Sequence, residues 1–253
     1  KAIELNPNYS LAYLNLSICL YLLDDIKSAF KSIEIAYDID SFNKDILLLF
    51  KILKGLKSRH RKDFEIEVIR KNFLNGESES EVVKLNRPVE KELVANLYTI
   101  HAKEAISKDK YQPVIIGNAL GSDFDLFGNE NSFLKTVKQD IVNILRNTLK
   151  SDVFIKDSFL TIFKSGGGVR SHHHITSLDN VLNLVPRKFS LVYYVSKGDQ
   201  KCEEPGILKL FNPNINILPH DGMIIIFPSD RLHSSFYSGS KDRIIIGINF
   251  YII

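Results

Sequence analysis

Apolar side chains recur at two different spacings along the chain, and the change between them divides it into two parts. Through residues 1–71 they recur every three or four positions, which predicts amphipathic helices. From residue 111 onward, short apolar runs alternate with glycine-containing turns, which predicts strands. The predicted strands cover residues 114–116, 153–163, 169–175, 189–195, 207–211, 223–227 and 243–253, and a further helix is predicted over residues 133–149.

These spacings predict an α+β protein in three segments. Residues 1–75 form a helical arm, and Asn75-Gly76 marks its end. Residues 76–110 form a bridge that is helical over residues 90–108. Residues 111–253 form a strand-rich domain, and many short strands with turns between them are typical of a sandwich or barrel.

Composition and charge exclude several classes of protein. The net charge is only +3 and the basic residues are dispersed, so no nucleic-acid footprint is indicated. Cys19 and Cys202 are too few and too far apart for a disulfide framework or a thiolate zinc site, and they suit a reducing cytoplasm. No apolar run approaches the roughly 18 residues of a membrane helix, so we expect a soluble protein without a membrane partner.

The helical arm resembles a tetratricopeptide repeat. Residues 1–40 look like one unit and the tail of its predecessor, and Ala2 and Ala36 are separated by the 34 residues of that repeat. Ser17 and Asp25 stand where glycines are usual, and an ordinary helical hairpin is the alternative. The chain begins inside this repeat, so we expect a missing upstream segment. Such repeats present concave surfaces, which implies a protein or peptide partner.

Three consecutive histidines are the first candidate for chemistry. If residues 169–175 form a strand, His172 and His174 share one face while His173 points away. His233 closes the strand-like run from residue 223 and is the natural third member of a divalent metal site. A solvated polar turn is the alternative.

The surrounding sequence resembles the C-terminal core of the Fe(II)/2-oxoglutarate dioxygenases, in particular their prolyl-hydroxylase-like branch. The resemblance spans residues 158–253 and rests on FSLVYYVSKGDQKCEEPGILKLFNP followed by LPHDGMIIIFPSDRLHSSFYSGSKDRIIIGINFYI. It implies a double-stranded β-helix, a cupin-like jelly-roll that holds iron at its mouth. The combination with tetratricopeptide repeats is similar to a group of bacterial and phage oxygenases.

The resemblance assigns roles to four positions. His172 and His233 match the two histidine ligands of the iron, and Arg243 matches the basic residue that binds the far carboxylate of 2-oxoglutarate. Tyr194 matches the tyrosine that supports this carboxylate, whereas strand alternation alone cannot choose between it and Tyr193. The implied reaction hydroxylates a C–H bond with O2 and 2-oxoglutarate, releases succinate and CO2, and is supported by ascorbate.

Strand alternation agrees with this role for Arg243. On the last predicted strand, Arg243, Ile245, Gly247 and Asn249 share one face. We expect Gly247 to leave room for a ligand there, while the opposite face is a packing surface.

One departure from the family pattern bears on activity. Most members have an aspartate two residues after the first histidine, whereas this chain has His174. Either His174 is the third ligand, or Asp179 reaches the metal, or the site has lost its activity. A three-histidine dioxygenase that does not use 2-oxoglutarate, and a non-catalytic scaffold that binds partners through its repeats, are therefore alternatives.

Overall fold

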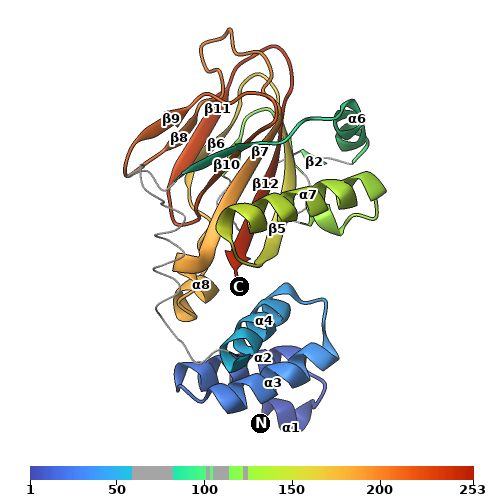
Figure 1. Cartoon of the computed structure of the whole chain (residues 1–253), viewed down its shortest axis with the longest axis vertical. Coiled ribbons are helices and arrows are strands. Elements are labelled where there is room, and N and C mark those ends of the chain that lie inside the picture. The colour runs from blue at the N-terminus through green and yellow to red at the C-terminus, as the bar shows by residue number, and fades with distance from the viewer. Residues whose placement is uncertain (59–81, 101–102, 105–113, 122–124) are drawn as a thin grey trace. The chain divides into compact units, whose positions relative to one another are not determined.

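The computed structural model describes residues 1–58, 82–100, 103–104, 114–121 and 125–253. They separate into two compact units (Figure 1). The first unit contains the N-terminal helices, the segment Ser177–Leu184 and Ile253. The second unit contains the strands and the remaining described residues.

The first unit is helical, as the spacing of its apolar residues predicts. Among the described residues its helices are α1 (Ala2–Leu5), α2 (Ser10–Leu22), α3 (Ile26–Ile39), α4 (Lys44–Ser58) and the short α8 (Ser177–Val181). The side chain of Asp25 caps α3 by accepting a hydrogen bond from the backbone N–H of Ser28. Buried Ser17 donates its hydroxyl to the carbonyl of Ala29, 2.8 Å away, which ties α2 to α3. Both residues that depart from the repeat pattern therefore have structural roles, and the assignment as a tetratricopeptide repeat stays a prediction.

Two antiparallel sheets form the second unit. Their strands are β1 (Val83–Asn86), β2 (Lys103–Glu104), β3 (Ile115–Ile116), β4 (Ala119–Gly121), β5 (Val153–Phe163), β6 (Gly167–His172), β7 (Lys188–Ser196), β8 (Leu208–Leu210), β9 (Ile215–Ile217), β10 (Met223–Pro228), β11 (His233–Tyr237) and β12 (Arg243–Ile252). Within the described residues the larger sheet runs β1-β10-β7-β12-β5-β4-β2, and the smaller one runs β3-β6-β11-β8-β9.

The core lies between the two sheets. Tyr194 and Phe227 of the larger sheet pack against Leu208, Leu210 and Ile217 of the smaller one, and all five are at most 3% exposed. Burial of these apolar side chains stabilises the sandwich by removing them from water. The prediction of an α+β protein whose strands form a sandwich or barrel is confirmed for this unit.

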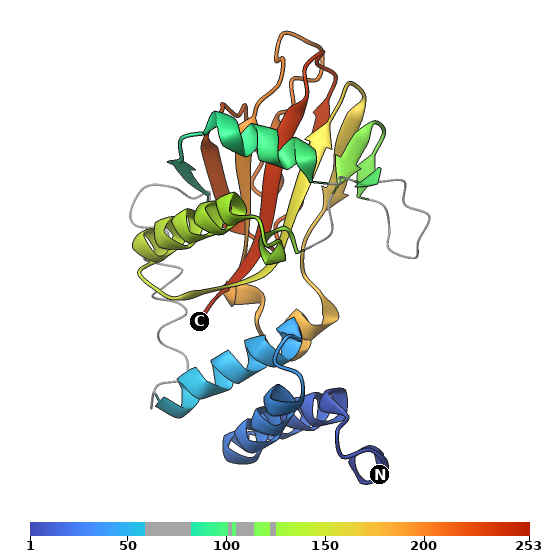
Figure 2. The same cartoon turned by 90° about the vertical axis from the view of Figure 1, so that its right-hand side faces the viewer.

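Helices α6 (Lys91–Thr99) and α7 (Ser132–Leu149) lie across the outer face of the larger sheet (Figure 2). The side chain of Asn131 caps α7 by accepting from the backbone N–H groups of Phe133 and Leu134. The buried side chains of α7 recur at helical spacing: Leu134, Val137, Ile141, Leu145 and Leu149. Short 3-10 turns, η1 (Leu126–Gly128) and η2 (Val185–Arg187), precede α7 and β7.

The bridge differs from its prediction. Its helix ends at Thr99, and Lys103–Glu104 is strand β2, so the helix predicted through residue 108 is wrong at these two positions. Val83–Asn86 pairs along β10, although no strand is predicted there. The predicted segment limits at residues 75 and 110, and the break at Asn75-Gly76, lie outside the described residues. Of the helices that the structure describes, none combines the length and the apolar character needed to cross a membrane.

Candidate functional site

Three histidines lie close together at the ends of two strands of the smaller sheet. His172 ends β6 and His233 begins β11, and the two residues are directly paired across these strands. His174 follows two residues after the end of β6. The ligand nitrogen that each ring offers lies within 4.8 Å of the other two, which is a spacing that one metal ion could bridge. The structure thus brings together the three histidines that the sequence selects.

The local backbone reaches this arrangement by a route that the sequence does not predict. Strand β6 ends at His172, so His174 is not placed by strand alternation; its backbone N–H donates to the carbonyl of Ser229, 2.8 Å away. His233 opens a strand rather than closing the preceding one, because β10 ends at Pro228. The N–H of Arg231 donates to the carbonyl of Pro228, and this turn separates the two strands.

Hydrogen bonds orient two of the imidazoles. The Nδ1 atom of His172 lies 2.7 Å from the carbonyl of Arg170, and Nδ1 of His233 lies 3.1 Å from the carbonyl of Arg231. A carbonyl oxygen can only accept, so each Nδ1 carries the proton and each Nε2 keeps a free lone pair. This arrangement is the usual one for histidines that bind a metal through Nε2.

Burial keeps the three rings neutral. It lowers the pKa of His172 and His174, and it lowers the pKa of His233 to about 3, with the neighbouring His172 adding to the effect. Neutral imidazole is the form that binds metal ions, so the site is ready for a cation at neutral pH.

Aromatic side chains close the space around the histidines. The ring of Phe159 lies 6.4 Å from that of His174, and the ring of Phe227 lies 4.8 Å from that of His233. A Cβ atom at Gly247 would overlap the ring of Phe159. The expectation that Gly247 leaves room for a ligand is therefore wrong, because Phe159 fills that room.

Arg243 is buried at the start of β12 and is only 2% exposed. Its guanidinium carbon lies 5.0 Å from the ring centre of Tyr194 and 6.0 Å from that of Tyr237. One long hydrogen bond of 3.4 Å joins Nη1 to the carbonyl of Pro205, and Nε has no partner among the described residues. Burial lowers the pKa of Arg243, and the Tyr194 hydroxyl offsets this only in part. The Nε–H group of the guanidinium could therefore donate a hydrogen bond to an anion.

The two neighbouring tyrosines serve different arginines. Tyr194 faces Arg243 inside the sandwich, and its burial raises the pKa of its hydroxyl. Tyr193 accepts a hydrogen bond of 3.0 Å from Arg87 and donates to the carbonyl of Pro88. Sequence reasoning selects Tyr194 through the resemblance, and it misses Arg87 and Tyr237 because neither belongs to a motif.

Asp179, the alternative third ligand, is buried in α8. Among the described residues, the group of three side chains that could hold a metal contains His174 and does not contain Asp179. The identity of the metal ligands stays a prediction.

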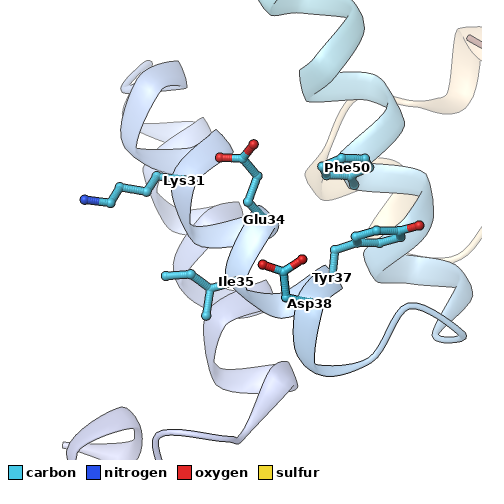
Figure 3. Close-up of a pocket in the computed structure, with 6 residues that line it drawn as sticks. All are labelled: Lys31, Glu34, Ile35, Tyr37, Asp38 and Phe50. Carbon is cyan, nitrogen blue, oxygen red and sulfur yellow. The ribbon is translucent and has the colours of Figure 1, made fainter.

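A separate hollow lies in the helical unit, on α3 and α4 (Figure 3). Its lining residues are Lys31, Glu34, Ile35, Tyr37, Asp38 and Phe50. The rings of Tyr37 and Phe50 stack with their centres 4.5 Å apart.

The chain is similar in fold to solved structures of prolyl hydroxylases. A prolyl-4-hydroxylase from Pseudomonas putida is 14% identical, with a TM-score of 0.53 over 74% of this chain and 99% of that one. The viral collagen prolyl hydroxylase from Paramecium bursaria Chlorella virus-1, in its 2-oxoglutarate complex, is 14% identical, with a TM-score of 0.51 over 69% and 98% of the two chains. A Trichoplax adhaerens prolyl hydroxylase, bound to a hypoxia inducible factor peptide fragment, is 15% identical, with a TM-score of 0.51 over 76% and 94%.

These likenesses confirm the fold that the sequence predicts for the strand-rich part, and at such low identity they establish the fold alone. No protein-family model matches the chain, and no curated protein matches it in sequence.

Proposed function

We propose that this protein is an Fe(II)- and 2-oxoglutarate-dependent dioxygenase that hydroxylates a C–H bond. In this proposal His172, His174 and His233 hold the iron, while Arg243 and Tyr194 hold the far carboxylate of 2-oxoglutarate. When bound, Fe(II) supplies the oxidative decarboxylation of 2-oxoglutarate by O2, which yields succinate and CO2 and transfers one oxygen atom to the substrate.

The observation that carries this proposal is the buried guanidinium of Arg243, which has no acidic partner among the described residues. An unpaired buried charge is costly, and a planar guanidinium matches a carboxylate with two parallel hydrogen bonds. The Tyr194 hydroxyl beside it can add a third polar contact. A dicarboxylate that places its other end at the three imidazoles would satisfy both features together.

The donor set fits a divalent transition metal. Imidazole nitrogen is a common ligand of iron, and two of the rings present Nε2 as described above. Three neutral ligands leave the full +2 charge of the ion uncompensated, whereas a carboxylate in place of His174 would cancel part of it. A dianionic co-substrate supplies the missing negative charge, which favours 2-oxoglutarate over a neutral ligand.

Calorimetry and product analysis test the proposal. Protein loaded with Fe(II) should bind 2-oxoglutarate and, with ascorbate and O2 present, should release succinate above the background without protein. Variant His233→Ala should lose the metal. Loaded wild-type protein that binds no 2-oxoglutarate and forms no succinate with a broad peptide panel would contradict the proposal.

A three-histidine dioxygenase that binds its substrate directly to the metal is the second candidate. The presence of a third histidine in place of a carboxylate favours it, because such sites occur in cupin-like barrels. Metal-dependent oxygen consumption without any 2-oxoglutarate binding would select this function over the first. Metal-free wild-type protein would favour a non-catalytic scaffold instead.

We further propose a protein or peptide substrate, recruited in part by the helical unit. The known prolyl hydroxylase with a bound peptide shares the fold of the second unit, and the hollow with Tyr37 and Phe50 offers aromatic contact surface. Cross-linking of a photoreactive peptide panel to wild type and to Tyr37→Ala measures the contribution of the hollow to peptide binding, and equal labelling of both would exclude such a contribution.

Cys19 and Cys202 are unpaired, which suits the reducing cytoplasm.

A further inference from the structure

A chain of hydrogen-bonded polar side chains runs across four neighbouring strands of the larger sheet and ends next to His174. It runs through Ser229, Ser190, Asn249 and Asp157, and the first three are at most 3% exposed. These residues come from four different places: the end of β10, and strands β7, β12 and β5. Buried polar groups carry a free-energy cost unless they are fully paired, so such a chain inside an apolar sandwich needs a reason.

The chain has a defined direction. Ser190 donates its hydroxyl proton to Oδ1 of Asn249 over 2.9 Å, so the hydroxyl of Ser229, 2.8 Å from that of Ser190, must be the donor of its own contact. Asn249 in turn donates from Nδ2 to the carboxylate of Asp157 over 3.3 Å. Every hydroxyl proton in the chain is used, which fixes the orientation of Ser229.

Ser229 connects this chain to the metal-site candidate. Its carbonyl accepts the backbone N–H of His174 over 2.8 Å, and its own N–H donates to the carbonyl of Lys188 over 3.0 Å. Because β6 ends at His172, His174 has no ladder pairing of this sheet to hold it. The hydrogen bond to Ser229 therefore anchors the backbone of the one histidine that departs from the family pattern.

We infer that Ser190 and Asn249 are positioning residues for His174. They fix Ser229, and Ser229 fixes the backbone of His174 at the distance from His172 and His233 that a shared metal ion requires. The inference rests on the proposed metal-binding function. It explains how a histidine beyond the end of a strand can be held firmly enough to replace the carboxylate of related sites, since supporting hydrogen bonds usually set ligand geometry.

Cobalt(II) binding to the full chain tests the inference without turnover. Ser190→Ala breaks the chain with the loss of one oxygen atom, and we expect it to weaken Co(II) binding tenfold to a hundredfold. The visible absorption of bound Co(II) should also change, because loss of His174 alters the coordination number. The matched control is Ser158→Ala: Ser158 is 1% exposed and accepts from the N–H of Phe127, outside this chain of contacts. It should leave both readouts unchanged.

A second variant and a double variant separate positioning from general damage. Asn249→Ala removes the acceptor at the other end and should produce the same loss of Co(II) affinity. The double variant should bind Co(II) no more weakly than either single one, because both interrupt the same chain. Thermal unfolding shows whether each variant is folded. If Ser190→Ala does not fold, the test relies on Asn249→Ala.

The outcomes distinguish this inference from the proposed function. Wild-type protein that binds no Co(II), Fe(II) or Zn(II) would overturn the metal site and the inference together. Wild-type binding with unchanged affinity and spectrum in a folded Ser190→Ala or Asn249→Ala would overturn the positioning role alone.

Discussion

Two buried arginines lie on opposite faces of the larger sheet, and their surroundings differ. Arg87 directly follows β1, is 4% exposed and donates to the carboxylates of Glu90 and Asp140, each over 2.8 Å. Arg243 begins β12, is 2% exposed and has no carboxylate partner among the described residues. Adjacent residues of β7 serve them, since Tyr193 bonds to Arg87 and Tyr194 stacks near Arg243.

Burial acts on the pKa of the two guanidinium groups with different outcomes. Burial lowers the pKa of Arg87, but its hydrogen bonds to Glu90, Asp140 and Tyr193 outweigh this and raise it overall. At Arg243 burial prevails and the pKa is lowered. The first guanidinium is neutralised within the protein and ties β1, α6 and α7 to β7. The second has no carboxylate partner among the described residues, and in the proposed function an anion supplies it, so the two arginines should respond oppositely to replacement.

The largest expected effect is on 2-oxoglutarate binding. Arg243→Met should weaken it by about 100-fold, roughly 2.7 kcal/mol, because two charge-assisted hydrogen bonds to the far carboxylate are lost. Arg87→Met is the matched control and should bind 2-oxoglutarate like the wild type. Calorimetry with metal-loaded protein measures both affinities, and equal losses in the two variants would remove the distinction between the sites.

Stability should show the reverse order. Arg87→Met should lower the free energy of unfolding by about 2 kcal/mol, less than the loss of a fully buried pair, because Glu90 and Asp140 are partly exposed and regain water. Arg243→Met should leave the stability of the ligand-free protein unchanged or raise it, since an unpaired buried charge is removed. Urea unfolding of both variants gives the two values, and a larger loss for Arg243→Met would refute a binding role for that burial.

Much of the fold follows from local patterns in the sequence. Residues 153–163 form an apolar-rich segment that predicts β5 at its observed limits, and the apolar run from residue 223 gives β10 to within one residue. The edge strand β1 leaves no such pattern, because it has only four residues and pairs along β10. Beyond the end of β6 at His172, the backbone of His174 makes a tertiary hydrogen bond to Ser229, which no local spacing encodes.

The candidate site likewise contains residues that the sequence reveals and residues that it does not. The three histidines and Arg243 stand in a recognisable order along the sequence, so they could be selected before their contacts were known. Arg87 could not, because its partner Tyr193 is 106 residues away and the pair belongs to no motif. Ser190 and Asn249 are equally hidden, since small polar residues on strands carry no signal until their partners are in place. The expectation for Gly247 is wrong because the ring that fills its space belongs to Phe159 on another strand.

A smaller effect should come from the backbone beside Arg243. Gly206 has a φ of 79°, and a Cβ atom there would overlap the Arg243 guanidinium. Gly206→Ala should weaken 2-oxoglutarate binding about tenfold by displacing the guanidinium, beyond the roughly 1–2 kcal/mol of stability that a left-handed alanine costs. Gly166→Ala is the control, because Gly166 has a φ of 82° with open space around it. Equal 2-oxoglutarate affinity in the two variants would show that Arg243 does not need its observed position.

The smallest effect should be the response of the Arg87 site to acid. Burial raises the pKa of Glu90, but the hydrogen bonds and charge of Arg87 outweigh this and hold it below the ordinary value of 4.5. The unfolded chain then binds more protons at Glu90 than the folded one, so this contribution is present above pH 4.5 and is lost as the pH falls through the folded value.

Urea unfolding of wild type and Arg87→Met from pH 7 down to pH 4 isolates that contribution, because the acid response of the buried histidines is common to both proteins and cancels in the difference. The stability gap between them should narrow as the pH falls. The difference in unfolding free energy between wild type and Arg243→Met should not narrow in this way, since Arg243 has no carboxylate partner among the described residues. If the difference in unfolding free energy between wild type and Arg87→Met is constant with pH, Glu90 does not bind Arg87 in solution. The contrast between Arg87 and Arg243 would then rest on the contacts of Arg87 with Asp140 and Tyr193 alone.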